Sequence, residues 1–279
     1  YIPTSFNYVL LRLIGKHDRI RTAPDTNYRT AWRPIYINTA ASVNNINGTA
    51  QTITFPTIAN QSATSLAQLS VNATSSLGSS YPVQFWVASG PYRNDENNSN
   101  LLIPDSIPVS SKYPMRVVVG AWQWGRPSTI QSATPVYNTF WIFQDNYALW
   151  KFTNYGSYDA SGNPVTPSTT ASDTATPLND GVPNLLKYAT GLSPQVVATT
   201  RPATQGQSSD GTHSTLTFNR IADSTLTYVV EATDDLTSGS WTTVWSSTGS
   251  SNVAGSVTAT DPELMANHPH RYLRLRVTH

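Results

Sequence analysis

The chain has 279 residues and a net charge of +1, with 38% hydrophobic, 10% aromatic and only 12% charged residues. This length fits two packed domains, or one large β-domain with an appendage. Charged residues reach about half their usual share, while Ser and Thr fill about a quarter of all positions. The apolar content excludes wholesale disorder, and the small net charge excludes a protein that wraps duplex nucleic acid. The absence of cysteine excludes disulfides, thiolate metal sites and cysteine nucleophiles.

The N-terminal segment, residues 1–34, forms a basic arm with six basic residues against two acidic ones. Such an arm can dock on an acidic neighbour, although a solvated flank fits equally well. The apolar run at 8–14 is interrupted by Arg12 and is far shorter than the ~20 residues of a membrane span, so we expect no such span. Because the chain starts with Tyr1 rather than Met, we expect a processed or truncated form, and the loss of an export signal is the simplest reason.

Residues 35–156 predict an antiparallel β-sandwich domain. Short runs rich in β-branched and aromatic residues alternate there with Asn, Gly, Pro and Ser clusters, and helix is scarce. The expected strands are 35–39, 51–58, 67–73, 83–88, 115–124 and 139–143.

Residues 157–179 are rich in Ser and Thr and have few apolar anchors, so they predict a linker or an extended strap at a domain boundary. Residues 180–191 predict one short helix, because Pro183 suits a first helical turn and Gly191 suits a C-terminal cap.

The strand pattern returns near the C-terminus and predicts a small antiparallel domain, 180–279, which includes the short helix. In the last strand, Leu273, Leu275 and Val277 alternate with Arg274 and Arg276, which places apolar and guanidinium groups on opposite faces. The predicted fold class is therefore all-β throughout. The expected strands of this domain are 214–218, 226–232, 241–245, 256–260 and 272–277.

Two stretches of this C-terminal third resemble a module that closes many large secreted bacterial proteins, including autotransporter-associated and polysaccharide-processing ones. The first is DGVPNLLKYATGLSP at 180–194, which is similar to the segment D-x-D-x-D-G-x-x-N-L-L-E-Y-A-L-G-x-x-P of that group. The second is LTYVVEATDDL at 226–236, followed by Trp241 and the closing strand RYLRLRV at 271–277. The resemblance implies secretion and an accessory module, and it supplies no activity.

In that group the acidic loop resembles a calcium loop, because a hard cation takes several carboxylate and carbonyl oxygens. Here Thr176 and Leu178 stand where two of the acids would be, and Lys187 replaces the following Glu. Only Asp180 of the acidic set remains. We therefore favour a helix-capping role for Asp180 and expect no metal and no cofactor.

The sequence carries no motif that predicts catalysis. A nucleophile elbow, a P-loop, a dinucleotide fingerprint and a zinc-protease motif are all missing, and the chain has only three Glu residues. His268 and His270 near Glu263 have the residue types of a metal site, but a turn before the last strand explains them as well. The oxygen-rich run at 93–100, which includes Asp95, is either a cation loop or a solvated loop. We predict that the protein is not an enzyme.

Aromatic residues suggest a second kind of surface. Trp122 and Trp124 share one strand face, with Trp141 and Phe143 expected nearby, so their rings suit stacking on the faces of sugars. Packing in the core or at a subunit interface is the commoner fate of such rings.

The leading hypothesis is a secreted, non-catalytic structural subunit that assembles with identical copies into an extracellular filament or surface layer. Outward strand faces coated with Ser, Thr, Asn and Gln repel one another weakly and favour extended protein contacts. The stretch at 8–14 would add as a strand to the sheet edge of a neighbour. The alternative is a carbohydrate-binding accessory module, and we expect no nucleic-acid partner. The residues assigned to the assembly arm are Tyr8, Leu10, Arg12, Ile14, Arg19 and Arg21.

Overall fold

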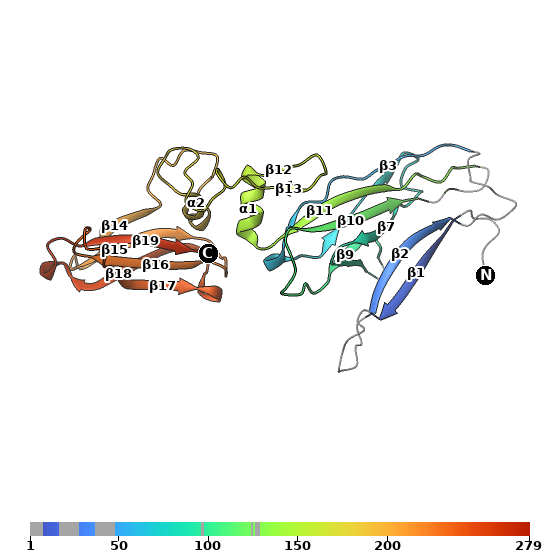
Figure 1. The fold of residues 1–279 in the computed structure, drawn as a ribbon. Coiled ribbons are helices and arrows are strands. Elements are labelled where there is room, and N and C mark those ends of the chain that lie inside the picture. The colour runs from blue at the N-terminus through green and yellow to red at the C-terminus, as the bar shows by residue number, and fades with distance from the viewer. Residues whose placement is uncertain (1–7, 17–27, 37–47, 96–97, 124, 126–128) are drawn as a thin grey trace. The chain divides into compact units, whose positions relative to one another are not determined.

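The computed structural model describes residues 8–16, 28–36, 48–95, 98–123, 125 and 129–279, and it confirms an all-β fold (Figure 1). The chain divides into two compact units, residues 1–145 and 146–279. The boundary therefore lies before the predicted linker. Residues 157–179 belong to the C-terminal unit, as does a helix, α1 (Asn146–Tyr155), that the sequence did not predict.

The N-terminal unit contains a four-stranded sheet in the order β4-β11-β10-β7. Pairing is antiparallel except between β11 and β4, and a bulge at Val118/Val119 interrupts the pairing of β10 with β7. Strands β7, β10 and β11 confirm the strands predicted at 83–88, 115–124 and 139–143, which are runs of β-branched and aromatic residues. The bounds are β4 (Gln61–Ser62), β7 (Gln84–Ser89), β10 (Met115–Trp122) and β11 (Val136–Phe143).

Smaller elements complete this unit. The predicted strands 51–58 and 67–73 are reduced to β3 and β5. Single backbone hydrogen bonds continue the pairing at Thr52, whose carbonyl accepts from Ser76 N at 2.9 Å, and at Val71, whose N–H donates to the carbonyl of Asn100 at 2.8 Å. A three-stranded sheet has the order β5-β9-β8, and β3 pairs with β6. The bounds are β3 (Ile53–Thr54), η1 (Ala63–Ser65), β5 (Leu69–Ser70), β6 (Thr74–Ser75), β8 (Tyr92–Asn94) and β9 (Leu101–Pro104).

One apolar core joins these sheets. Phe85 of β7, Val119 of β10 and Leu102 of β9 are fully or almost fully buried in it. Gly120 makes the packing possible, because a Cβ at this position would overlap the buried ring of Trp86.

A hairpin of β1 (Tyr8–Lys16) and β2 (Tyr28–Tyr36) forms a sheet of its own. The two nine-residue strands pair antiparallel along their whole length, from Tyr8 opposite Tyr36 to Lys16 opposite Tyr28. The predicted strand at 35–39 therefore begins earlier, at Tyr28, and residues 37–39 lie outside the described ranges.

The C-terminal unit is a six-stranded antiparallel sandwich. One sheet has the order β14-β15-β18 and the other the order β17-β16-β19. All five predicted strands are present, and β14 is an addition. The bounds are β14 (Ala203–Gln207), β15 (His213–Arg220), β16 (Thr227–Thr233), β17 (Thr242–Thr248), η2 (Gly249–Ser251), β18 (Gly255–Leu264), η3 (Met265–Asn267) and β19 (Tyr272–Thr278).

The predicted alternation in β19 is confirmed. Leu273, Leu275 and Val277 pack against the core of the sandwich, while Arg274 and Arg276 are exposed. This core also contains Tyr147 of α1 and Tyr188 and Ala189 of α2 (Asn184–Thr190).

The residues that flank helix α2 set its two ends. It starts after Pro183 and ends at Gly191, whose left-handed φ of 71° closes the helix as predicted. Hydrogen bonds fasten its C-terminal end to the sandwich: Tyr228 Oη and Ile221 N both donate to the carbonyl of Ala189, at 2.8 and 3.2 Å, and Tyr188 Oη bonds Asp223. Helix α2 and the sandwich are therefore one packed body.

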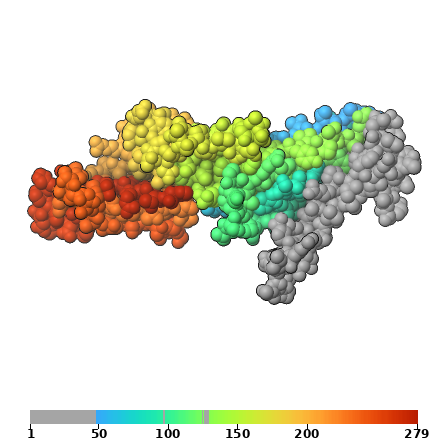
Figure 2. Space-filling view, in the orientation of Figure 1, coloured from blue at the N-terminus to red at the C-terminus, as the bar shows by residue number. Residues whose placement is uncertain are grey.

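The Ser/Thr-rich stretch lies on this body as a strap rather than a free linker. It contains a short hairpin of β12 (Ser157–Tyr158) and β13 (Pro164–Val165). Further along, the side chain of Asn184 donates to the carbonyls of Thr170 and Ser172 at 2.8 and 3.0 Å. In Figure 2 the yellow atoms above the orange and red strands belong to the end of this stretch and to α2.

Candidate functional site

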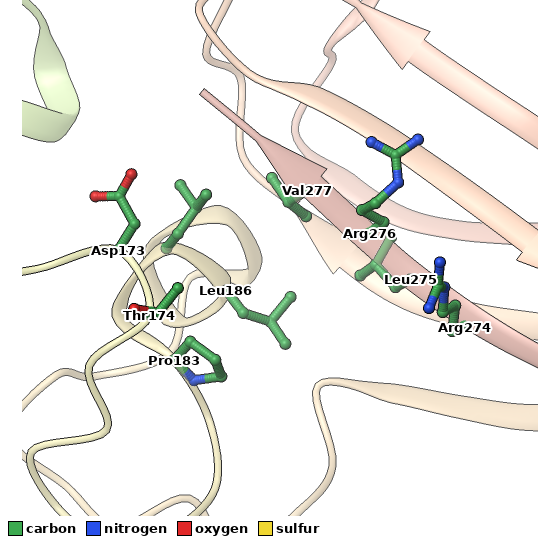
Figure 3. Close-up of a pocket in the computed structure, with 9 residues that line it drawn as sticks. Asp173, Thr174, Pro183, Leu186, Arg274, Leu275, Arg276 and Val277 are labelled. Atoms are coloured by element: carbon green, nitrogen blue, oxygen red, sulfur yellow. The ribbon is translucent and has the colours of Figure 1, made fainter. Parts of the chain in front are cut away.

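The C-terminal unit has an open groove of about 340 Å³ between α2 and β19 (Figure 3). Pro183, Leu185 and Leu186 form the wall on the α2 side, and residues 274–277 form the wall on the β19 side. Figure 3 shows Leu275 and Val277 reaching from β19 toward the α2 segment. Because β19 pairs only with β16 among the described strands, its other edge is open along this groove.

Two guanidinium groups border the apolar groove. Glu231 accepts hydrogen bonds from Nε of Arg274 and Nε of Arg276, both at 2.9 Å, and Arg274 also stacks on Trp241 at 3.8 Å. The hydrogen bond from Arg276 is the main cause that lowers the pKa of Glu231, and Arg274 adds to it. Each arginine side chain is still 45% exposed. Asp173, which pairs with Lys151 at 3.2 Å, also lines the groove. The groove is therefore apolar inside and carries side chains of both charges at its border.

The retained acid of the calcium-like loop has a partner that the sequence did not predict. Asp180 does not cap α2, because Pro183 lies at the N-cap position and no side chain caps the helix there. Its carboxylate instead accepts backbone hydrogen bonds from Val182 at 3.1 Å and Ala198 at 2.9 Å, and it contacts Lys187 Nζ at 2.6 Å. The two charged side chains are 1% and 0% exposed.

The pairing fixes the charge of Asp180. The hydrogen bond from Lys187, followed by that from Ala198, lowers the pKa of Asp180 to about 2. The Lys187 ammonium also donates to the carbonyl of Val196 at 3.4 Å. The lysine therefore supplies the positive charge at this carboxylate and ties the loop, helix α2 and residues 196–198 together.

We expect the C-terminal unit to lose stability as pH falls from about 4 toward 2. A carboxyl whose folded pKa lies below the unfolded value of about 3.9 contributes stability above that value and loses it as pH falls through the folded pKa. The folded pKa of Asp180 is about 2. Melting temperatures measured between pH 2 and 5 should fall less steeply in Asp180→Asn. Asp210→Asn is the control. The pKa of Asp210 is also lowered to about 2, mainly by Ser208, but this group lies in an exposed turn. Because solvent screens an exposed carboxylate, the melting temperature of Asp210→Asn should depend on pH nearly as it does in the unmodified chain. Equal slopes for Asp180→Asn and the unmodified chain would contradict the assignment.

His268 lies in a turn between two carboxylates. Its Nδ1 is 2.9 Å from Asp234 and its Nε2 is 3.5 Å from Glu263, after the short 3₁₀ helix η3. Neither this trio nor any other group of three or more His, Asp or Glu residues in the described part of the chain is arranged so that it could hold a metal ion. In the other oxygen-rich run, Asp95 accepts the backbone N–H of Asn98 at 3.0 Å, while Glu96 and Asn97 lie outside the described ranges.

The predicted sugar-stacking face is not formed by the tryptophans that the structure describes. Trp122 is 1% exposed, and its indole N–H donates to the carbonyl of Ala133 at 2.9 Å. Trp141 is 7% exposed, and Phe143 is 5% exposed. These rings are therefore buried, which is the commoner of the two outcomes that the sequence allowed for them. Trp124 lies outside the described residues.

The predicted assembly arm is only partly described. Tyr8, Leu10, Arg12 and Ile14 lie in β1, where they pair in register with β2. The arm is thus one half of a hairpin rather than a lone strand. Arg19 and Arg21 lie outside the described residues.

Sequence reasoning missed the groove and the buried lysine. The alternation in the last strand did place Arg274 and Arg276 on one face, but nothing in the pattern indicated that α2 lies beside that strand. Comparison with protein-family models, curated proteins and solved structures finds no match for this chain. No helix within the described ranges is long and apolar enough to cross a membrane.

Proposed function

We propose that this chain is a secreted, non-catalytic structural subunit that assembles with identical copies into an extracellular filament or surface layer. The observation that carries the proposal is the β1–β2 hairpin. Within the described ranges, no third strand pairs with it. Strand β2 lies close to β7 and β8 without pairing with them. The unpaired outer edges of a two-stranded sheet present backbone groups to another chain.

The composition of the hairpin favours assembly. Strand β1, with the sequence YVLLRLIGK, has apolar residues at both odd and even positions, so neither alternating face is purely polar. A strand of this kind gains free energy when both of its faces are buried. A second copy of the same hairpin, added edge to edge, supplies both backbone hydrogen bonds and apolar contacts.

The charge distribution favours contacts between copies. Residues 1–34 carry six basic and two acidic residues, a net charge of +4. The C-terminal unit carries seven basic and ten acidic residues, a net charge of −3. Opposite charges on two parts of one chain attract neighbouring copies at low ionic strength and weaken as salt rises.

Breaking the hairpin should prevent polymer formation. Leu11→Pro removes a backbone N–H from the middle of β1 and so deletes one hydrogen bond, either to β2 or across the open edge to a neighbouring copy. We expect the unmodified chain to sediment as large polymers with regular spacing in electron micrographs, and the variant to sediment at the monomer mass of 30.4 kDa.

Leu11→Ile is the matched control, because it keeps the backbone donor and a high strand propensity. The melting transition of the C-terminal unit should be the same in all three proteins. An unmodified chain that stays monomeric at every concentration, or polymers that survive Leu11→Pro, would rule out hairpin-driven assembly.

A further inference from the structure

We propose that His268 is a proton-linked clasp: when its imidazole takes up a proton, it fastens the loop after β16 to the end of β18. The two strands belong to different sheets, so the clasp joins the sheets of the C-terminal sandwich at one end. This inference does not depend on the proposed self-assembly, because it concerns contacts within one copy.

His268 lies between carboxylates that come from both sheets. Its Nδ1 is 2.9 Å from Asp234, which follows β16, and its Nε2 is 3.5 Å from Glu263 of β18. Strand β16 belongs to the sheet β17-β16-β19, and β18 belongs to the sheet β14-β15-β18. The histidine side chain is 22% exposed, so solvent reaches it only in part.

Only the imidazolium form satisfies both contacts. A neutral imidazole has one N–H and one lone pair, whichever tautomer is present. In either tautomer, the lone pair of one ring nitrogen would face a carboxylate oxygen, and the two repel each other. A proton from solvent converts that nitrogen into a second donor. Both carboxylates then receive a charge-assisted hydrogen bond, and His268 bridges them.

One guanidinium does not neutralise the carboxylates around His268. Arg271 binds Asp261 through Nε at 2.6 Å and Nη2 at 3.0 Å, and it reaches Asp234 with Nη1 at 3.3 Å. Among the described residues, Glu263 forms an ion pair with His268 only. Three carboxylates against one guanidinium give a net charge of −2 while His268 is neutral, and the imidazolium reduces it to −1.

The aspartates stay charged over the pH range in which histidine side chains titrate. Desolvation would raise the pKa of Asp234, but the hydrogen bonds and charges of His268 and Arg271 together outweigh it and lower this pKa below its usual range. Desolvation also opposes a lowered pKa at Asp261, and there Arg271 is the main group that outweighs it. Histidine side chains titrate between about pH 5 and 8. A pH change within this range therefore leaves both aspartates ionised.

A second histidine of the same unit shows why the partners of His268 matter. Nδ1 of His213 is 2.9 Å from the carbonyl of Asp261 and 3.1 Å from that of Glu263. A carbonyl oxygen accepts an N–H, and the neutral tautomer with its hydrogen on Nδ1 donates one. The contact of His213 therefore needs no added proton, whereas the double contact of His268 does.

Hydrogen exchange of the full chain, followed by mass spectrometry, measures the clasp. Peptides over 234–240 and 263–270 contain hydrogen-bonded amides of the two joined segments, such as those of Thr237 and His268. After correction for the intrinsic pH dependence of exchange, protection should be about two- to five-fold higher at pH 5 than at pH 8, as expected for a partly exposed ion pair. His268→Gln should remove this difference, because an amide does not titrate in this range.

The matched controls are His270→Gln and His213→Gln. His270 is exposed two residues further along the same turn, and the contact of His213 needs no added proton. Both controls should keep the pH difference. Glu263→Gln keeps the histidine but removes one carboxylate, and it should reduce the difference. Circular dichroism and melting temperatures check that each variant is folded. Equal protection at the two pH values in the unmodified chain, or a difference that survives His268→Gln, would overturn the clasp.

Discussion

Replacing Lys187 with methionine should lower the melting temperature of the C-terminal unit by about 10 °C. The ammonium is fully buried and lies 2.6 Å from the carboxylate of Asp180, which is itself 1% exposed. Methionine keeps much of the length of the side chain but removes the charge, so the Asp180 carboxylate stays buried without its cation. Calorimetry on the full chain measures the shift.

Two further variants make this test specific. Lys151→Met removes a lysine from a more exposed pair, with Asp173 at 3.2 Å, and should change the melting temperature little. The double variant Lys187→Met/Asp180→Asn leaves no uncompensated charge and should recover part of the loss. If Lys187→Met is no more harmful than Lys151→Met, the ion pair does not stabilise the fold in the way described.

Replacing Trp122 with alanine should destabilise the N-terminal unit by about 3–5 kcal/mol. The indole is 1% exposed within the core of β7, β10 and β11, and its N–H bonds the carbonyl of Ala133. Removing it opens a large cavity and leaves that carbonyl without the donor. Chemical denaturation, followed by the fluorescence of the remaining tryptophans, measures the loss.

The matched control for this change is Tyr137→Ala, which removes an aromatic side chain that is 58% exposed on β11. Its effect on the free energy of unfolding should be within about 1 kcal/mol. A Trp122→Ala protein that unfolds like the unmodified chain and loses only the binding of a glycan would contradict the core assignment.

The elements that the sequence predicted best have strong local signals. Strands β10 and β11 are runs of β-branched and aromatic residues, and β19 alternates apolar and basic side chains. Gly191 marked the end of α2, because a left-handed residue closes a helix there. These patterns report burial and backbone geometry within a few residues, so one sequence is enough to show them.

The missed features depend on contacts between distant parts of the chain. Helix α1 contains Trp, Phe and Tyr residues with modest helix propensity, and it is helical because Tyr147 packs in the core of the sandwich. In the sequence, Lys187 stands where the resembling segment has a Glu, and this substitution only counted against a cation site. The fold shows what the sequence did not, because it brings the ammonium of Lys187 to the carboxylate of Asp180. The groove arises in the same way, because α2 and β19 are about 90 residues apart in the sequence.

The hydrogen bonds of Tyr228 and Ile221 to the carbonyl of Ala189 have a consequence for recognition. They fix the spacing between α2 and the sandwich, so both walls of the groove keep their positions before anything binds. A preorganised receptor loses little conformational entropy when it is occupied, and its selectivity then depends on shape. An occupant too large for the groove should be rejected by rigid walls rather than accommodated by their movement.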